Sequence, residues 1–390
     1  MSTTTEMKLE DRVFTGDHFS SGNKSAAEGA IAAGVCGYFG YPITPSSSLM
    51  EHIVKRLPKS DPTAKFLQCE DEIASITATI GCSWTRRKSM TSTSGPGFSL
   101  MQEGIGLAVF TETPLVLINV QRGGPSTGLP TFPGQQEMMQ SHFGSHGDYI
   151  VPTLAPASVQ ECFDLTVEAF NASEALRTPV FVNSDQVLSS LYERFTIPDK
   201  SKLEIINRGR PGGPDVVWKG ETISKTLVPH MNCFGEEKKA FSTGLSHDET
   251  GHVNLTPDVY ENLMHRLNKK IITYQHLLPK AEEYMTDGAE TIIVAYGSTA
   301  RAAKLAVKTM RQKGTKVGLF RLRTLWPFPK EDLVRVCQDK RVLVVEISAG
   351  QLIWPVERFL HREVEHLGHL RGVVPPPSLI QKYVNKEVKS

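Results

Sequence analysis

The alternation of short apolar runs with helical patterns most constrains the fold of this 390-residue chain. Between about residues 21 and 190, β-branched apolar segments alternate with segments of helical periodicity. The expected strands are Lys65–Cys69, Ser89–Thr93, Pro114–Val120 and Pro179–Ser184. The expected helices are Ser25–Phe39, Pro45–Leu57, Glu72–Trp84 and Ala157–Leu176. Near-continuous apolar strands separated by helices predict an α/β fold whose parallel sheet is covered by helices on both faces.

A second α/β unit follows after a break in this pattern. From about residue 191 to 285, isolated polar residues and glycine- and proline-rich stretches such as Arg208–Pro214 predict an extended connection without a core of its own. Alternation then resumes, with expected strands at Glu290–Tyr296, Lys316–Leu322 and Arg341–Ile347 and expected helices at 298–314 and 329–337. We therefore divide the chain into an N-terminal extension (1–20), a first domain (21–228), an extended linker (229–285) and a second domain (286–390).

Charge and cysteine usage exclude several classes of protein. Lysine and arginine number 43 against 42 acidic residues, which argues against a nucleic-acid or membrane-surface partner. No apolar run approaches the roughly 20 residues of a membrane-spanning helix, and the polar N-terminus lacks the apolar segment of a signal peptide. The six cysteines are scattered, so neither a disulfide framework nor a local iron–sulfur motif is expected. The expected location is the cytoplasm, and no metal site is expected in this chain.

Two motifs in the first half could bind a carboxylate or a cofactor. The first motif is Tyr41-Pro-Ile-Thr-Pro-Ser-Ser47, in which Thr44 and Pro45 can begin a helix as its N-cap and first helical residue. Alternatively, the Thr44 hydroxyl and the N-terminus of this helix can face an anion. Glu70-Asp-Glu72 follows an expected strand and opens an expected helix. Its carboxylates can complement the helix dipole, or lie at the sheet edge where open α/β sheets bind their ligands. Both interpretations remain open for each motif.

Two glycine-rich stretches follow expected strands. Thr91–Met101 neither completes G-x-G-x-x-G nor carries the P-loop lysine, so its loop is expected to let backbone approach a flat ligand or another chain. Gln121–Gly128 contains a G-x-S-x-G match around Ser126, the signature of a hydrolase nucleophile. Two prolines soon after Ser126 argue against the helix that this nucleophile requires. Arg122 is better interpreted as a guanidinium for an anionic ligand, with a surface or interface ion pair as the alternative.

His142, His146 and Asp148 form a third cluster, and two histidines four residues apart can bind a metal on a helix. The glycines at 144 and 147 instead predict a loop. Hydrogen bonding within this loop is the preferred interpretation.

In combination these motifs resemble one family, the α subunits of 2-oxoacid:ferredoxin oxidoreductases, most closely the 2-oxoglutarate type. The matching segments are, in order, Tyr41–Ser47, Glu70–Ala74, Thr93–Met101, Gln121–Gly128 and Thr243–Gly251. The likeness covers nearly the whole chain from about residue 21. It implies a pyrimidine-type thiamine-diphosphate-binding domain with a parallel sheet, followed by a transketolase C-terminal-like α/β domain with a structural and dimer-forming role.

The resemblance also implies roles for single residues. Glu72 would contact N1′ of the aminopyrimidine, where a carboxyl group favours the tautomer that deprotonates C2 of the thiazolium. Glu70 is the alternative for this contact. Thr44 and Arg122 match the positions that meet the carboxylate and keto group of the 2-oxoacid. Further expected cofactor contacts are Ser94, Gly95 and Gly97, and further expected substrate contacts are Tyr41, Ile43, Ser126 and Thr127.

The implied activity is a thiamine-diphosphate-dependent, CoA-acylating oxidative decarboxylation, with 2-oxoglutarate and coenzyme A giving succinyl-CoA and CO₂ in a reaction that is reversible in principle. The Gly-Asp-Gly…Asn motif of the diphosphate site and the cluster cysteines are both absent from the sequence. The resemblance therefore implies a β subunit carrying the diphosphate and Mg²⁺ site and a [4Fe-4S] cluster, ferredoxin as electron acceptor, and a dimer of heteromers. Separate γ and δ subunits are further candidates, since some relatives carry an extra fused N-terminal domain. The alternatives are the same chemistry on pyruvate, branched-chain or aryl 2-oxoacids, or a non-catalytic assembly subunit.

Overall fold

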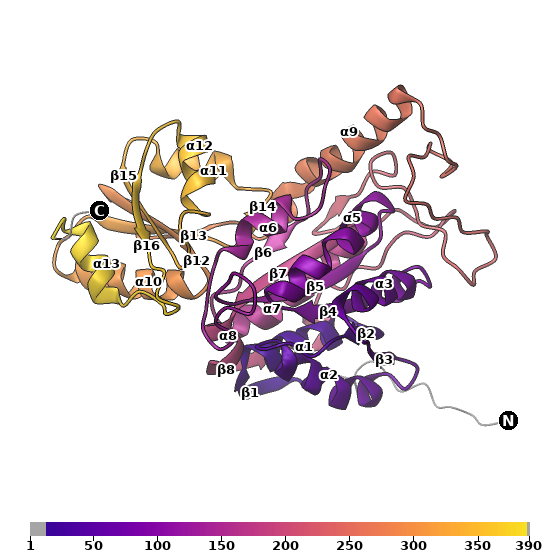
Figure 1. Cartoon of the computed structure of the whole chain (residues 1–390), viewed down its shortest axis with the longest axis horizontal. Coiled ribbons are helices and arrows are strands. Elements are labelled where there is room, and N and C mark those ends of the chain that lie inside the picture. Colours follow the sequence, from indigo (N-terminus) through magenta and orange to yellow (C-terminus); the bar gives the residue numbers. More distant parts are fainter. Residues whose placement is uncertain (1–12, 388–390) are drawn as a thin grey trace.

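The computed structural model describes residues 13–387, and its first domain is built on a seven-stranded sheet (Figure 1). The strand order is β14-β6-β7-β5-β4-β2-β3. The strands are β2 (Gly37–Gly40), β3 (Lys65–Gln68), β4 (Ser89–Thr93), β5 (Leu115–Gln121), β6 (Thr153–Leu154), β7 (Pro179–Asp185) and β14 (Thr324–Trp326). All neighbours pair in parallel except β14 with β6. The predicted α/β fold with a parallel sheet is confirmed.

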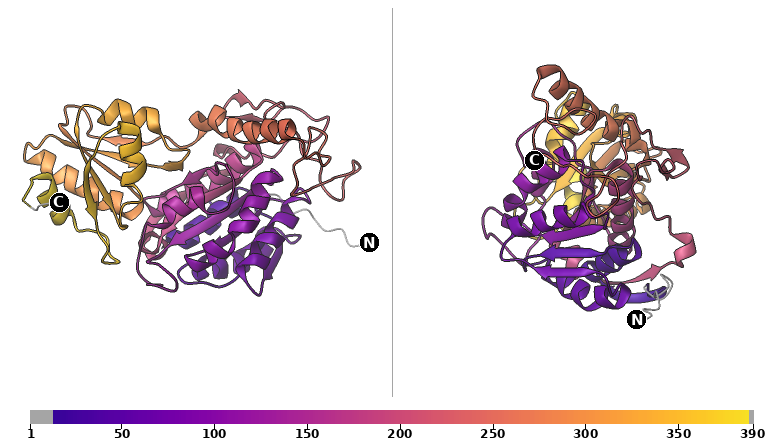
Figure 2. Two further views of the ribbon diagram at one scale, coloured as in Figure 1. Left: turned by 45° about the horizontal axis from the view of Figure 1, so that its top comes forward. Right: turned by 90° about the vertical axis from the view of Figure 1, so that its right-hand side faces the viewer.

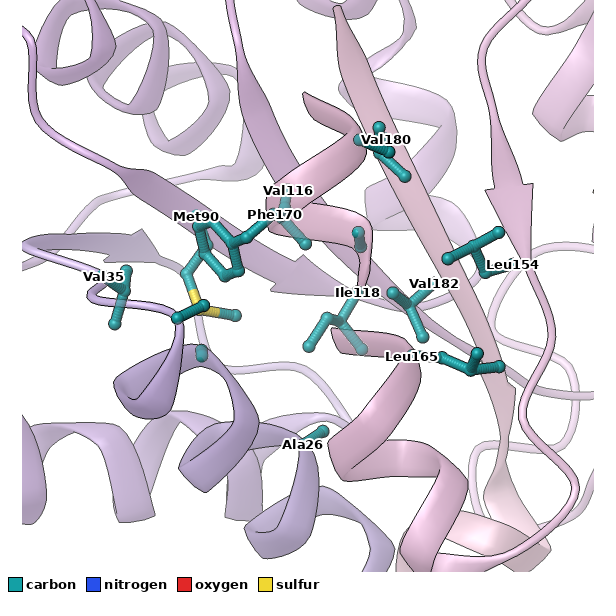
Figure 3. Packing of buried hydrophobic residues seen from close by; sticks show 14 of the residues in the cluster. Ala26, Val35, Met90, Val116, Ile118, Leu154, Leu165, Phe170, Val180 and Val182 are labelled. Atoms are coloured by element: carbon teal, nitrogen blue, oxygen red, sulfur yellow. The ribbon is translucent and has the colours of Figure 1, made fainter. Parts of the chain in front are cut away.

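Helices cover both faces of this sheet because its central strands are apolar on both sides. On β5, Val116 and Ile118 pack into one buried cluster with residues of four helices, whereas Leu115 and Leu117 pack into another cluster with three different helices. The first group is α1 (Gly22–Ala32), α2 (Ser47–Ser60), α7 (Val159–Leu176) and the later helix α9 (Pro257–Tyr274), and the second is α3 (Glu72–Ser83), α4 (Pro96–Leu100) and α5 (Gln102–Phe110). Figure 3 shows the first cluster, in which Phe170 of α7 lies near the strand residues. Successive strand residues point to opposite faces, so an unbroken apolar run buries both.

The first predicted helix, Ser25–Phe39, is too long at its C-terminal end. Helix α1 ends at Ala32, and Gly37–Gly40 forms strand β2, which lies between β4 and the edge strand β3. The backbone N–H of Gly37 donates to the carbonyl of Lys88 at 3.1 Å, next to β4. Pairing with two neighbouring strands decides the conformation of this short segment, and helical periodicity cannot reveal that pairing.

The second domain has a five-stranded sheet of order β11-β13-β12-β15-β16. Its strands are β11 (Glu282–Tyr284), β12 (Thr291–Tyr296), β13 (Val317–Leu322), β15 (Arg341–Glu346) and β16 (Glu365–Gly368). Its helices are α10 (Gly297–Gln312), α11 (Lys330–Cys337), α12 (Ile353–Leu360) and α13 (Pro377–Val384). The two domains lie side by side (Figures 1 and 2), and β14, which follows β13 in the chain, pairs with β6 of the first sheet. The first sheet is therefore completed by a strand from the far side of the linker.

The segment predicted as an extended linker contains an 18-residue helix, α9 (Pro257–Tyr274), which runs along the first domain (Figure 1). Buried charges hold it there: the Glu112 carboxylate pairs with Lys270 Nζ at 2.8 Å and with Arg266 Nη2 at 2.7 Å. Although burial opposes ionisation, Lys270, Arg177 and Arg266 together hold the pKa of Glu112 far below its usual range. The sequence pattern misses this helix because part of its contact surface is charged and is buried by pairing rather than by apolar packing.

The remaining elements flank these two sheets. They are β1 (Gly16–Ser21), which pairs antiparallel with β8 (Tyr192–Ile197), the short pair β9 (Val217–Trp218) and β10 (Glu221–Thr222), the helices α6 (Glu137–Phe143) and α8 (Gln186–Ser190), and 3₁₀ turns at Lys200–Lys202 and Gln275–Leu277. No helix between residues 13 and 387 combines the length and the apolar character needed to cross a membrane.

Lys88, directly before β4, yields a testable prediction about stability. Its side chain is buried and its Nζ donates to the carbonyl of Ala33 at 2.9 Å. Burial lowers the pKa of Lys88 to about 8, against an ordinary value of 10.5. The folded chain thus releases this proton at a lower pH than the unfolded chain, so Lys88 makes folding more favourable as the pH rises between these two values. Replacing it with methionine should raise the free energy of unfolding at pH 7 by about 1–3 kcal/mol.

The gain from Lys88→Met should shrink as the pH rises from 8 towards 10.5, and urea unfolding at several pH values measures it. The exposed Lys65 on edge strand β3 offers a matched control, since Lys65→Met should change stability by less than about 0.5 kcal/mol at pH 7. A difference between wild type and Lys88→Met that stays constant over this pH range would contradict the prediction.

Candidate active site

The motif residues gather at the carboxyl ends of four neighbouring strands. Strand β3 leads into Glu70–Glu72, and its neighbour β2 leads into Tyr41–Thr44. The next strand, β4, leads into Ser94–Gly97, and β5 leads into Arg122. Because the strands are parallel and adjacent, the four loops meet at one edge of the sheet. Open α/β sheets bind their ligands at this edge.

Glu72 is the carboxylate that lies inside this site. It is the first residue of α3 and is only 5% exposed, whereas Glu70 is exposed. The helix is capped by Asp71, whose side chain accepts a hydrogen bond from the N–H of Ala74 at 2.7 Å, so α3 does not need Glu72 as its cap. Burial raises the pKa of the Glu72 carboxyl, and the charge of Asp71 acts in the same direction. Glu72 is thus a buried acid that helix formation does not require.

The loop after β4 is shaped for close approach. Gly95 has φ +48°, and a β-carbon there would lie 3.0 Å from Nε of Arg122. A β-carbon at Gly97 would overlap the Glu72 carboxyl and the Thr93 hydroxyl. Larger residues at either glycine would push into Arg122 or Glu72.

Several polar atoms around this loop are buried without a hydrogen-bond partner among residues 13–387. They are Thr93 Oγ1, Ser94 Oγ and Arg122 Nε. A buried polar group left unpaired costs about 1–3 kcal/mol, so such a cluster indicates a ligand that supplies the partners. Together with the Glu72 carboxyl, these hydroxyls suit a flat heterocycle with ring nitrogen and amino groups, as in the aminopyrimidine of thiamine.

Arg122 follows β5 and is held against the loop after β2. The residue is 4% exposed, and its Nη1 donates to the carbonyl of Thr44 at 2.6 Å. Burial lowers the pKa of Arg122, and the nearby carboxyl groups of Glu137 and Glu72 act in the opposite direction. The structure brings Arg122 and Thr44 together through the main chain of Thr44.

The predicted helix cap at Thr44 is wrong. Helix α2 begins at Ser47 with Ser46 as its N-cap residue, so neither Thr44 nor Pro45 lies at the helix start. Thr44 is exposed, and its main-chain carbonyl contacts Arg122. Its hydroxyl is therefore available to a ligand at this edge.

The remaining predicted substrate contacts lie at the periphery of the site. Tyr41 is 39% exposed and Ile43 is half-buried, in the loop after β2. Ser126 and Thr127 lie in an exposed turn after Arg122. No helix follows Ser126 until Glu137, so the geometry of a hydrolase nucleophile is not formed.

The predicted loop around His142 is partly helical. His142 lies in α6 and stacks on Trp326, with ring centroids 4.3 Å apart, whereas His146 and Asp148 lie in the loop that follows. Across residues 13–387, no group of three or more histidine, cysteine or acidic residues could hold a metal ion.

Sequence inspection missed one residue of the site, Glu137. Its carboxylate is buried and accepts hydrogen bonds from the backbone N–H groups of Arg122 at 3.1 Å and Gly95 at 3.2 Å. It is also the first residue of α6. An acidic residue in a first helical turn is common, so its position in the sequence carries no signal of this contact.

Comparison with known proteins agrees with this architecture. The family described as "Pyruvate flavodoxin/ferredoxin oxidoreductase, thiamine diP-bdg" matches residues 28–265, and "Pyruvate:ferredoxin oxidoreductase core domain II" matches residues 289–379. The 2-oxoglutarate synthase subunit KorA of Methanocaldococcus jannaschii is 45% identical over 94% of this chain and 98% of its own length. The ketoisovalerate oxidoreductase subunit VorB of Methanothermobacter thermautotrophicus is 36% identical over 85% of this chain and 86% of its own length.

Solved structures show the same fold. A 2-oxoglutarate:ferredoxin oxidoreductase from Magnetococcus marinus, with 2-oxoglutarate, coenzyme A and succinyl-CoA bound, superposes with a TM-score of 0.89 at 32% identity. The superposition covers 96% of this chain and 65% of that chain. A transketolase from Campylobacter jejuni shares the fold alone, with a TM-score of 0.55 at 11% identity over 97% of this chain and 48% of that chain.

Fold and site together define a thiamine-diphosphate-binding domain joined to a second α/β domain, in the manner of transketolase. The chain belongs to the 2-oxoacid:ferredoxin oxidoreductase family, among the α subunits of the 2-oxoglutarate type. Because these relatives are named as subunits, the chain is one part of a multi-subunit enzyme.

Proposed function

We propose that this chain is the α subunit of an enzyme that converts 2-oxoglutarate and coenzyme A into succinyl-CoA and CO₂ and passes the electrons to ferredoxin. The observation that carries the proposal is the buried Glu72 facing Gly97, with Arg122 at the same sheet edge. A buried acid and a tight glycine loop suit the aminopyrimidine ring of the cofactor. A buried guanidinium suits the carboxylate of a 2-oxoacid.

Glu72 holds and returns a proton at N1′ of the aminopyrimidine. When bound, thiamine diphosphate supplies the electron sink for decarboxylation. Burial raises the pKa of Glu72, which keeps its proton available at a higher pH than in an exposed glutamate. Ser94 Oγ offers a further polar contact, and Gly95 and Gly97 let the ring approach the backbone. Glu70 is exposed, which favours Glu72 for this role.

Arg122 binds the carboxylate of the 2-oxoacid. Its guanidinium is buried, so water screens its charge weakly, and a carboxylate can accept from it along two bonds. The exposed hydroxyl of Thr44 lies in the loop that Arg122 contacts and would meet the keto oxygen. Tyr41, Ile43, Ser126 and Thr127 surround the acid's side chain in this proposal.

The rest of the reaction requires partners. A β subunit would supply the diphosphate and Mg²⁺ site and a [4Fe-4S] cluster, since this sequence contains neither motif. Separate γ and δ subunits and a dimer of heteromers complete the proposed assembly. In the proposed division, the chain consists of an extension (1–20), a first domain (21–228), a linker (229–285) and a second domain (286–390). The second domain would have a structural and dimer-forming role. Six free cysteines fit a cytoplasmic enzyme.

Branched-chain 2-oxoacids are the second candidate substrates, because a ketoisovalerate oxidoreductase subunit is 36% identical to this chain. Both substrate classes present the same carboxylate and keto group to Arg122 and Thr44. They differ at the side chain, where the exposed loops of the site lie.

The proposal is tested by purifying the chain with its natural β subunit and assaying viologen reduction. The substrates are 2-oxoglutarate, pyruvate, 3-methyl-2-oxobutanoate and an aryl pyruvate, each with and without coenzyme A. We expect the highest kcat/KM with 2-oxoglutarate, and only when coenzyme A is present. A preference for the branched acid would favour the second candidate. No reduction with any acid, from a complex with intact clusters, would refute the proposed function.

A further inference from the structure

Glu137 connects the two loops that carry the site. One carboxylate oxygen accepts from the backbone N–H of Arg122 at 3.1 Å, and the other accepts from the N–H of Gly95 at 3.2 Å. The first loop follows β5 and carries the guanidinium, and the second follows β4 and lies against it, since a β-carbon at Gly95 would approach Arg122 Nε. The carboxylate is buried, so it is shielded from competing water.

The segment around Glu137 also holds the carbonyl of Arg122. Nε2 of Gln136 donates to the Arg122 carbonyl at 2.7 Å, so both main-chain polar groups of Arg122 are bound by residues 136 and 137. The Arg122 side chain makes one hydrogen bond, from Nη1 to the Thr44 carbonyl, while its Nε has no partner within residues 13–387. The direction of the guanidinium is thus determined largely by how its main chain is held.

The second domain anchors this segment through Gln135. The Gln135 N–H donates to the carbonyl of Ile347 at 2.9 Å, and its Oε1 accepts from the Ile347 N–H at 3.0 Å. Its Nε2 donates to the carbonyl of Tyr296 at 3.0 Å. Residues 135–137 therefore form a short connection from the sheet of the second domain to Arg122.

We propose that Glu137 is a positioning residue, which aims the Arg122 guanidinium at the carboxylate of the 2-oxoacid and sets its distance from the Gly95 loop. This inference rests on the proposed role of Arg122 in binding the substrate. A carboxylate is needed because both of its oxygens can accept from an N–H at once. A glutamine side chain has one acceptor oxygen, and its amino group would face the other N–H as a second donor. Burial raises the pKa of Glu137, while the two N–H groups and the Arg122 charge favour its ionised form.

The test is Glu137→Gln in the complete complex with its β subunit, assayed by viologen reduction. We expect the KM for the 2-oxoacid to rise by about tenfold or more, as expected for losing one charge-assisted hydrogen bond, with a smaller change in kcat. Asp185→Asn is the matched control. Asp185 is also buried and likewise accepts from two backbone N–H groups, those of Leu188 and Ser298, each at 3.0 Å. This control should lower the thermal midpoint and leave the KM within about twofold.

A double-mutant cycle separates positioning from general damage. In an Arg122→Ala background, Glu137→Gln should change kcat/KM by less than about twofold, because the group that it positions is gone. An unchanged KM in Glu137→Gln, or a full additional loss in the Arg122→Ala background, would overturn the inference. If Glu137→Gln does not assemble, Gln136→Ala tests the same connection and should raise the KM in the same direction, and an unchanged KM there would also overturn it. Failure of the proposed function would look different, as an absence of 2-oxoacid oxidation in the wild-type complex or a normal KM in Arg122→Ala.

Discussion

Glu72→Ala in the assembled complex should lower kcat for 2-oxoacid oxidation by at least about 100-fold, since a positioned acid or base contributes roughly 10²- to 10⁴-fold. The Glu72 carboxyl is buried and faces Gly97. The Thr93 hydroxyl, which also faces Gly97, has no hydrogen-bond partner among residues 13–387. In the proposed mechanism, removal of Glu72 leaves no carboxyl to hold a proton at N1′. Folding should survive, because Asp71 caps α3 without it. Viologen reduction measures the loss, and thermal unfolding checks the fold.

Glu70→Ala is the control for this prediction. Glu70 lies two residues away and is exposed, so its replacement should leave kcat within about threefold. The reverse outcome, with Glu70→Ala inactive and Glu72→Ala active, would assign the pyrimidine contact to Glu70. Normal turnover in both variants would support a non-catalytic assembly subunit.

Arg122→Ala should lower kcat/KM for the 2-oxoacid by about 100-fold or more, mostly through a higher KM, because the proposed charge-assisted contact to the substrate carboxylate is lost. Arg122 is buried and its Nε has no hydrogen-bond partner within the described chain, which fits a group that binds an anionic ligand. Steady-state kinetics across a range of 2-oxoacid concentrations measures the effect.

Arg122→Lys refines this prediction. Lysine keeps the positive charge but lacks the planar fork that binds a carboxylate along two bonds, so its KM should lie between wild type and Arg122→Ala. A wild-type KM in Arg122→Ala would remove Arg122 from the substrate site. Equal losses in both variants would show that fork geometry, rather than charge, dominates the contact.

Much of the first domain could be predicted because its signals are local. The run Pro114–Val120 is apolar at almost every position, and only a strand buried on both faces accommodates that pattern; the structure has β5 at Leu115–Gln121. Strand Gly37–Gly40 and helix α9 were not predicted, because contacts with distant residues determine their structure. Gly37–Gly40 is a strand because it pairs with β3 and β4. Helix α9 is held in part by the buried ion pair between Lys270 and Glu112.

Periodicity and residue type are local properties of the chain, so the class of fold and the chemistry available to the site could be predicted from the amino-acid sequence. It placed acidic residues after one strand, glycines after a second and an arginine after a third. Which of these groups lie together depends on how the chain folds. The fold buries Glu72 and exposes Glu70, and it brings Glu137 to Arg122 and Gly95 across the sheet edge. Burial and hydrogen bonding between distant residues arise only when the strands align, so no spacing along the chain encodes them.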